Sequence, residues 1–295
     1  MGLCPFTVFL EVSMVLRILF TVFLALFTIS PALAAEKKTV KLVYVEWPCA
    51  VVTHSIAKVA IEERLGYTVE LIPVSVPVKF QAIASGEADA TLAAWLPTTQ
   101  GTYLEALKGK LLDLGPLVTG TRIGWVVPDY VPYKSIEELR GKAKEFKGKI
   151  FGIDPGAVYM ETSEKAIGEY GLDGFTLDTS NDAVMVAMLA DHIKRNEPVI
   201  VTGWAPHWKF GKWNLHFLDD PKKLFGEEEA IHTVVRLGLK EDMPDVYQAL
   251  DAFAFIDTVQ LQQLMAENNE KGADPLENAR AFVRKNKEQV DSWFK

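Results

Sequence analysis

Three tryptophans in this chain have the residue type and the spacing to enclose a cation between aromatic faces. Each ends a strand-like apolar run: Trp47 after residues 40–46, Trp95 after 90–94, and Trp204 after 198–203. Proline follows each tryptophan within two residues, and because proline interrupts strand pairing, each ring should lie where a strand gives way to a loop. Loops at the carboxyl ends of parallel strands carry the binding sites of such sheets. The alternative for each tryptophan is a place in the core.

A second group suited to binding follows the predicted strand 150–153. We expect a helix to begin near Met160, and the residues that lead into it are Asp154, Pro155, Gly156 and Ala157. The first N–H groups of a helix have no partner within it, so a helix N-terminus attracts anions. These residues therefore form either an anion site or a simple turn before the helix.

The N-terminal stretch reads as a secretory signal peptide covering residues 1–34. A basic start at Met14–Arg17 precedes an apolar run at 18–29, and Ala32-Leu33-Ala34 supplies a cleavage pattern, which makes Met14 an alternative start of the protein. The run is short for a membrane span, which needs about 20 residues. We expect an exported protein, periplasmic or associated with the cell surface.

Composition excludes several classes of protein. The 261 residues that follow Ala34 in this 295-residue chain contain one cysteine, Cys49, so no internal disulfide can form. The net charge is −8, and lysines and arginines are interleaved with acids instead of forming the basic block that a nucleic-acid surface needs. Nucleic acid is therefore an unsuitable partner.

Strand and helix signals alternate through two similar series, which predicts an α/β fold with parallel sheets covered by helices. Trp47 and Trp95 are 48 positions apart, and Asp154 and Trp204 are 50 apart. This pseudo-repeat predicts two lobes facing a cleft. We assign residues 35–120 and 237–295 to lobe 1 and 121–236 to lobe 2, with hinges near 119–121 and 236–239, and the helical segment from about Leu237 packing back on lobe 1.

Several segments resemble, in order, the glycine betaine/choline-binding proteins of osmoprotectant ABC importers. The matching segments cover nearly all of the chain after residue 34: Val45-Glu46-Trp47, Ala93-Ala94-Trp95-Leu96-Pro97, residues 120–128, Gly152-Ile153-Asp154-Pro155-Gly156, Thr202-Gly203-Trp204-Ala205-Pro206-His207-Trp208, and residues 231–236. The resemblance implies a two-lobed periplasmic-binding-protein fold of type II, with the ligand in the cleft between lobes. It also implies a receptor without enzymatic activity or cofactor, which delivers its ligand to a membrane permease.

By matching position, the resemblance implies a cage made of Trp47, Trp95 and Trp204. Such a cage suits a quaternary ammonium, which cannot donate hydrogen bonds and is attracted to each ring face by roughly 0.5–2 kcal/mol. It further implies that the main-chain N–H groups of Val158 and Tyr159, after Gly156 and Ala157, hold the carboxylate of a betaine.

Two departures from the family pattern bear on the ligand. Pro48-Cys49 replaces a polar pair common in relatives, and Gln100 stands where the best-known betaine binders carry a histidine. Gln100 can still donate through its amide, but it is neutral. Tyr159 stands where relatives often have an aliphatic residue, and it could add a hydroxyl or ring to the site. Glycine betaine remains the expected ligand, with choline, carnitine or another methylated onium solute as alternatives.

Other chemistry is less well supported by the sequence. The five histidines are scattered without the spacing of a metal site, and Cys49 lacks the histidine and acid that would activate a thiol. We expect no metal site and a monomer. The competing hypothesis is an exported sensor or enzyme on the same scaffold, because fold alone does not determine function.

Overall fold

A computed structural model describes residues 38–295, so the predicted signal peptide lies outside the described residues. The strands are β1 Thr39–Tyr44, β2 Thr68–Pro73, β3 Ala90–Leu96, β4 Leu111–Pro128, β5 Lys149–Phe151, β6 Thr176–Asp178, β7 Ile200–Ala205, β8 Leu215–Phe217 and β9 Glu229–Arg236. The α-helices are α2 Pro48–Leu65, α3 Val76–Ser85, α4 Gly101–Ala106, α5 Val158–Glu169, α6 Asp182–Arg195, α7 Lys209–Lys212, α8 Leu239–Asp242, α9 Pro244–Asp251, α10 Thr258–Asn268, α11 Pro275–Lys285 and α12 Lys287–Ser292. Two 3₁₀ turns cover Ile136–Leu139 and Ala143–Phe146.

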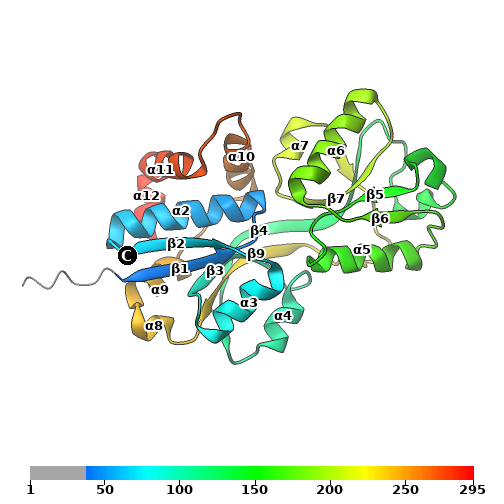
Figure 1. The fold of residues 1–295 in the computed structure, drawn as a ribbon. Helices are drawn as coiled ribbons and strands as arrows, with labels where there is room; N and C mark the ends of the chain where they lie inside the picture. The colour runs from blue at the N-terminus through cyan, green and yellow to red at the C-terminus, as the bar shows by residue number, and fades with distance from the viewer. Residues whose placement is uncertain (1–37) are drawn as a thin grey trace, which may run out of the picture. The chain divides into compact units, whose positions relative to one another are not determined.

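The strands form two groups that share β4 (Figure 1). Sheet A has the order β2-β1-β3-β9-β4, and sheet B has the order β4-β7-β5-β6, with β8 also pairing with β4. The β1–β2, β1–β3, β5–β6 and β5–β7 pairs are parallel, as the alternation of strands and helices predicts. The pairs that involve β4 and β9 are antiparallel, so each sheet is mixed.

Strand β4 runs through both sheets, and its partner changes midway. From Leu111 to Thr121 it pairs with β9, and from Arg122 to Val126 it pairs with β7. The predicted first hinge, 119–121, lies at this change of partner.

The position of β9 differs from the sequence-based boundary at residue 236. This strand pairs with β3 and β4 in sheet A over its whole length, and Arg236 lies opposite Leu111. The chain therefore passes from sheet B to sheet A before Glu229, and the predicted second hinge near 236–239 lies beyond the far end of β9. The sequence of one strand does not show which strands it pairs with, because the strands that pair with β9 lie more than 100 positions away in the chain.

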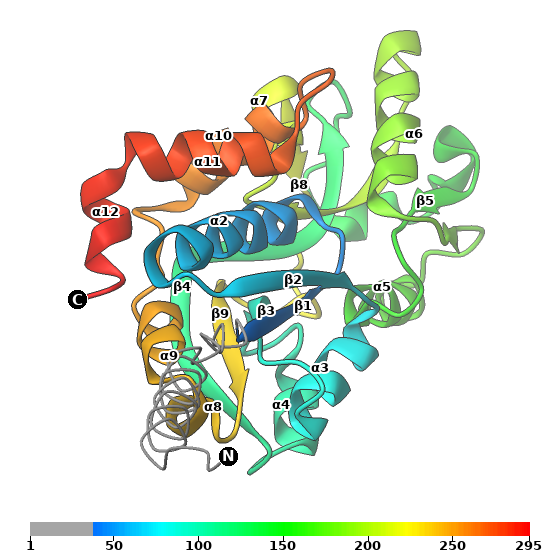
Figure 2. The same ribbon diagram turned by 60° about the vertical axis from the view of Figure 1, so that its left-hand side comes forward.

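Helix α2 covers sheet A and is itself covered by the C-terminal helices (Figure 2). Proline stands at its first position, where a missing N–H costs nothing, and the helix ends at Gly66, whose φ of 73° suits glycine. Helices α10 and α11 pack on α2, as expected for a segment that returns to the first lobe. The opposite face of α2 packs on sheet A and buries His54, which accepts from the Leu92 N–H of β3 at 3.2 Å and stacks on Tyr44 of β1.

Candidate functional site

The three tryptophans lie at strand ends, as predicted. Trp47 is the N-cap residue of α2, shortly after β1, and Trp95 and Trp204 are the second-last residues of β3 and β7. The Leu96–Pro97 and Ala205–Pro206 peptide bonds that follow the two strand tryptophans are both cis. Sheet A thus supplies Trp95, and sheet B supplies Trp204.

A small cavity of about 30 Å³ brings these rings together with most of the other predicted residues. Its lining consists of Trp47, Trp95, Thr99, Gln100, Ile123, Ala157, Val158, Tyr159 and Trp204. Gly156 lines a larger neighbouring cavity instead. Thr99 and Ile123 were not predicted; Ile123 is opposite Trp204 in the β4–β7 pair, a neighbour that only the strand register reveals.

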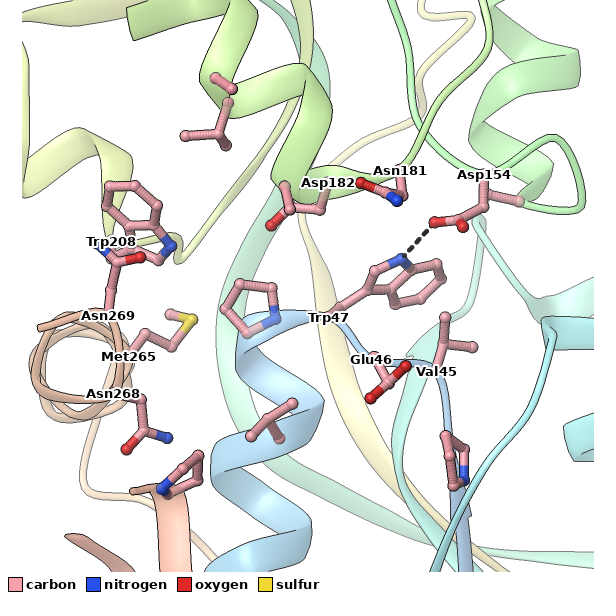
Figure 3. A pocket seen from close by; sticks show the side chains of 18 of the residues that line it. Val45, Glu46, Trp47, Asp154, Asn181, Asp182, Trp208, Met265, Asn268 and Asn269 are labelled. Carbon is pink, nitrogen blue, oxygen red and sulfur yellow. Dashed lines mark hydrogen bonds between the residues drawn. The ribbon is translucent and has the colours of Figure 1, made fainter. Parts of the chain in front are cut away.

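Trp47 and Trp204 form adjoining walls of the small cavity. Their ring centroids are 6.3 Å apart and their planes are inclined by 49°. The indole N–H of Trp47 donates to Oδ2 of Asp154 at 3.4 Å (Figure 3), so the ring is tied to the loop before α5. All three tryptophans are buried, with exposures of 8%, 3% and 4% for Trp47, Trp95 and Trp204.

A buried polar cluster supports Trp204. His207 meets the ring edge-on at a centroid distance of 4.9 Å, and Nζ of Lys209 lies 4.4 Å from the ring centroid. Nδ1 of His207 accepts from the Lys209 N–H at 3.1 Å, so Nε2 carries the proton and donates to Asp182 at 3.2 Å. Burial lowers the pKa of His207 to about 4 and that of Lys209 to about 8.

The N-terminus of α5 presents free donors at the cavity. Ala157 is the N-cap residue and no side chain caps the helix; within residues 38–295 the N–H groups of Val158 and Tyr159 have no hydrogen-bond partner. Anions are stabilised at such a position by the N–H groups and the helix dipole. These are the two amides that the family resemblance indicates.

The hydroxyl of Tyr159 is not available to a ligand. It accepts from the Gly203 N–H at 2.7 Å and the Gly124 N–H at 3.1 Å, and its one proton is shared between the carbonyl oxygens of the same two glycines. Burial raises the pKa of this hydroxyl far above its usual range. Tyr159 therefore fastens α5 to the β4–β7 pair, and only its main chain and ring can line the site.

The loop that carries Gln100 is fixed by a buried acid. Oε1 of Glu229 accepts from the N–H groups of Thr98 at 2.5 Å and Thr99 at 2.6 Å, and Oε2 accepts from the Thr99 hydroxyl. Oε1 of Gln100 accepts from Nζ of Lys79 at 3.0 Å. Lys79 was missed by sequence reasoning, although it falls on the buried face of α3 with Val76, Phe80 and Ile83, and this helical spacing is a usable signal.

The larger cavity, of about 1080 Å³, lies on the other side of Trp47 and Ala157, which line both cavities (Figure 3). It is bordered by the loops after β1 and β5, by α6 and α7, and by Met265, Asn268 and Asn269 of α10. Glu46, Asp154 and Asp182 give this lining an acidic character.

Cys49 and Trp125 do not line the small cavity. Cys49 is 1% exposed, and burial raises the pKa of its thiol to about 12, which disfavours a reactive thiolate. Trp125 is wholly buried and donates to the Ser163 hydroxyl, outside the cavity lining. Within residues 38–295, no three histidine, cysteine or acidic side chains are grouped as metal ligands, and no helix is long and apolar enough to cross a membrane.

Comparison with known proteins identifies the class to which this fold and site belong. Residues 38–285 match the model of the substrate-binding domain of ABC-type glycine betaine transport systems. The chain therefore belongs to this family, which consists of transport binding proteins and not of enzymes.

Individual relatives agree with the family match. The glycine betaine/carnitine transport binding protein GbuC of Listeria monocytogenes is 42% identical over 164 residues, which are 55% of this chain and 53% of that protein. The chain thus spans about half the length of this curated relative.

Two solved structures share the type II periplasmic-binding-protein fold with this chain. The glycine betaine/L-proline-binding protein ProX of Borrelia burgdorferi is 41% identical, with a TM-score of 0.84 over 88% of this chain and 97% of that one. Lactococcal OpuAC, solved closed around glycine betaine, is 36% identical, with a TM-score of 0.82 over 88% of this chain and 100% of that one.

Proposed function

We propose that this protein is the receptor of an ABC importer and that it captures a betaine-like onium compound, with glycine betaine as the principal ligand. The observation that carries the proposal is the small cavity, where Trp95 of sheet A, Trp204 of sheet B and Trp47 at the start of α2 meet two unpartnered main-chain N–H groups. Aromatic faces suit a methylated cation, and free N–H groups suit a carboxylate. A betaine carries both groups.

In the proposed complex, the trimethylammonium group lies among Trp47, Trp95 and Trp204. Its carboxylate accepts from the N–H groups of Val158 and Tyr159, with Gln100 as a further donor. No covalent chemistry is required, in keeping with a family of transport binding proteins.

We further propose that sheets A and B are the cores of two lobes that close on the ligand. Residues 39–121 and 229–295 would form the first lobe and residues 122–228 the second, with the boundary moved from 236 because β9 belongs to sheet A. The relatives' names support delivery to a membrane permease. We propose an exported, monomeric protein, periplasmic or held at the cell surface.

Isothermal titration calorimetry against a panel of onium solutes tests the function. The panel consists of glycine betaine, proline betaine, carnitine, choline and trimethylamine oxide. Each compound has a methylated nitrogen that is cationic or polarised, and the compounds differ in the group at the opposite end of the molecule. We expect glycine betaine to bind tightly and to be recovered unchanged. Choline binding more tightly than glycine betaine would reassign the receptor to choline uptake, and no binding by any member would contradict the proposed function.

A further inference from the structure

Lys79 is a buried cation directly behind the candidate ligand site. Its side chain is fully buried, and Nζ donates to the carbonyl oxygen of Ala93 at 2.8 Å and to Oε1 of Gln100 at 3.0 Å. No carboxylate of the described residues pairs with it. The titratable groups near it are Cys49 and His54 of α2, and burial holds both in their neutral forms at pH 7. Burial lowers the pKa of Lys79 to about 7, and in its protonated form the positive charge has no compensating charge within the protein.

The contact with Lys79 fixes the orientation of the Gln100 amide. An ammonium can only donate, so the Gln100 atom facing Lys79 must be the oxygen. The same oxygen lies 3.4 Å from the main-chain N–H of Trp95. Because Gln100 lines the small cavity and its oxygen is engaged from two sides, the NH₂ group is the end left for a ligand.

We propose that Lys79 and Gln100 together select for ligands that carry a carboxylate in addition to the onium group. This inference rests on the proposed function. The ammonium of Lys79 polarises the amide of Gln100, so its NH₂ group donates more strongly, and the ligand's carboxylate supplies the negative charge that the protein lacks there. A cation without a carboxylate, such as choline, gains neither effect and is repelled by the buried charge. Lys79 acts through Gln100, so it is a positioning and selectivity residue.

The substitution Lys79→Met separates this role from a purely structural one, because methionine keeps an apolar stem of similar length without the charge. Calorimetry with glycine betaine and choline should show betaine affinity falling by roughly tenfold or more, as for loss of a charge-assisted hydrogen bond, while choline affinity does not fall. Lys110→Met, at an exposed lysine outside the site, is the matched control and should leave both affinities unchanged. Unchanged betaine affinity, or equal losses for the two ligands, would overturn the inference.

Gln100→Glu gives a second test should the methionine variant fold poorly. A carboxylate at position 100 would pair with Lys79 and present negative charge to the cavity, so betaine affinity should collapse while choline affinity rises. Retained betaine affinity in this variant would refute selection by the pair. A wild-type protein that binds neither ligand would contradict the proposed function itself, whereas normal wild-type betaine binding with unaltered selectivity in both variants would contradict only the role of Lys79.

Discussion

At the scale of single residues, the three tryptophans are predicted to contribute separable parts of the binding energy. Replacing Trp47, Trp95 or Trp204 by Ala should weaken glycine betaine binding by about 1–3 kcal/mol each, and replacement by Phe should cost less because an aromatic face remains. Calorimetry measures the loss, and circular dichroism should show unchanged secondary structure.

Trp293→Phe is a suitable control for these variants, because Trp293 is buried against Phe253 in the C-terminal helices and does not line the cavity. It should affect stability and leave affinity unchanged. If the three Ala variants bound as tightly as the wild type, the cage assignment would be wrong.

Betaine affinity should depend on pH through the charge of Lys79. Burial lowers the pKa of Lys79 to about 7, and a bound carboxylate favours its protonated form, so betaine binding should take up a proton as the pH rises above 7. Lys209, behind Trp204, has its pKa lowered by burial to about 8, and loss of its charge would favour a cation. The measurement compares the betaine affinity of the wild type with that of Lys79→Met. We expect the ratio of these two affinities to fall between pH 6 and 9, by up to about tenfold per pH unit above pH 7. A ratio independent of pH would contradict this linkage.

At the level of elements, Tyr159 is one of the side chains that attach α5 to sheet B, together with Ser163, whose hydroxyl accepts from the Trp125 indole N–H. Tyr159→Phe would remove the hydroxyl that hydrogen-bonds to the main chain of Gly124 and Gly203, which lie opposite each other in the β4–β7 pair. Loss of a buried hydrogen-bond partner is costly, so we expect a loss of about 1–3 kcal/mol in the free energy of unfolding. Urea unfolding measures this change, and calorimetry should show weaker betaine binding because the N-terminus of α5 becomes less well placed. Stability equal to that of the wild type would show that the hydroxyl is dispensable.

The sequence predicted the local elements well where the pattern was regular. Trp95 and Trp204 lie at the ends of their strands, as expected. An apolar run favours a buried strand, and the proline after it prevents further strand pairing. The apolar run at residues 123–127, which ends at Pro128, predicts only the last part of β4, whereas the strand extends over Leu111–Pro128. Gly115 and Pro116 interrupt its alternation, and the register shifts around them show that the strand absorbs these residues as bulges.

The site was less predictable where it depends on pairing between distant segments. Lys79 was missed because a charged residue in a helix is usually exposed, and its partner Gln100 lies 21 positions away. Ile123 likewise joins the cavity only through the register between β4 and β7. Residue patterns identify strand ends and helix starts, but they do not show which of these ends meet.

At the scale of the whole molecule, the proposed lobes are joined by β4 and by the segment leading into β9. Gly226 in that segment has a φ of 80°, and a Cβ there would lie 2.7 Å from the Thr98 side chain, so the connection packs closely on the loop that also carries Gln100. A ligand that touches both lobes stabilises the closed form by its differential affinity for that form.

We therefore expect closure on binding. Small-angle scattering should show a smaller radius of gyration with saturating glycine betaine than without ligand, and tryptophan fluorescence should change as the rings lose water. Choline, titrated to the same fractional occupancy, serves as the comparison ligand. Tight binding without compaction, together with sensitivity to mutations on one sheet only, would contradict the two-lobed mechanism.

The place of β9 between β3 and β4 also constrains how the chain can fold. Residues 229–236 fill an interior position of sheet A, more than 100 positions after β4 begins, so β3 and β4 have no shared neighbour until this late segment has been synthesised. Pairings of such long sequence separation close large loops and slow folding. On the ribosome, the first half of the chain should therefore remain without its completed sheet A, and the native form of this sheet should appear only after β9 has emerged and inserted.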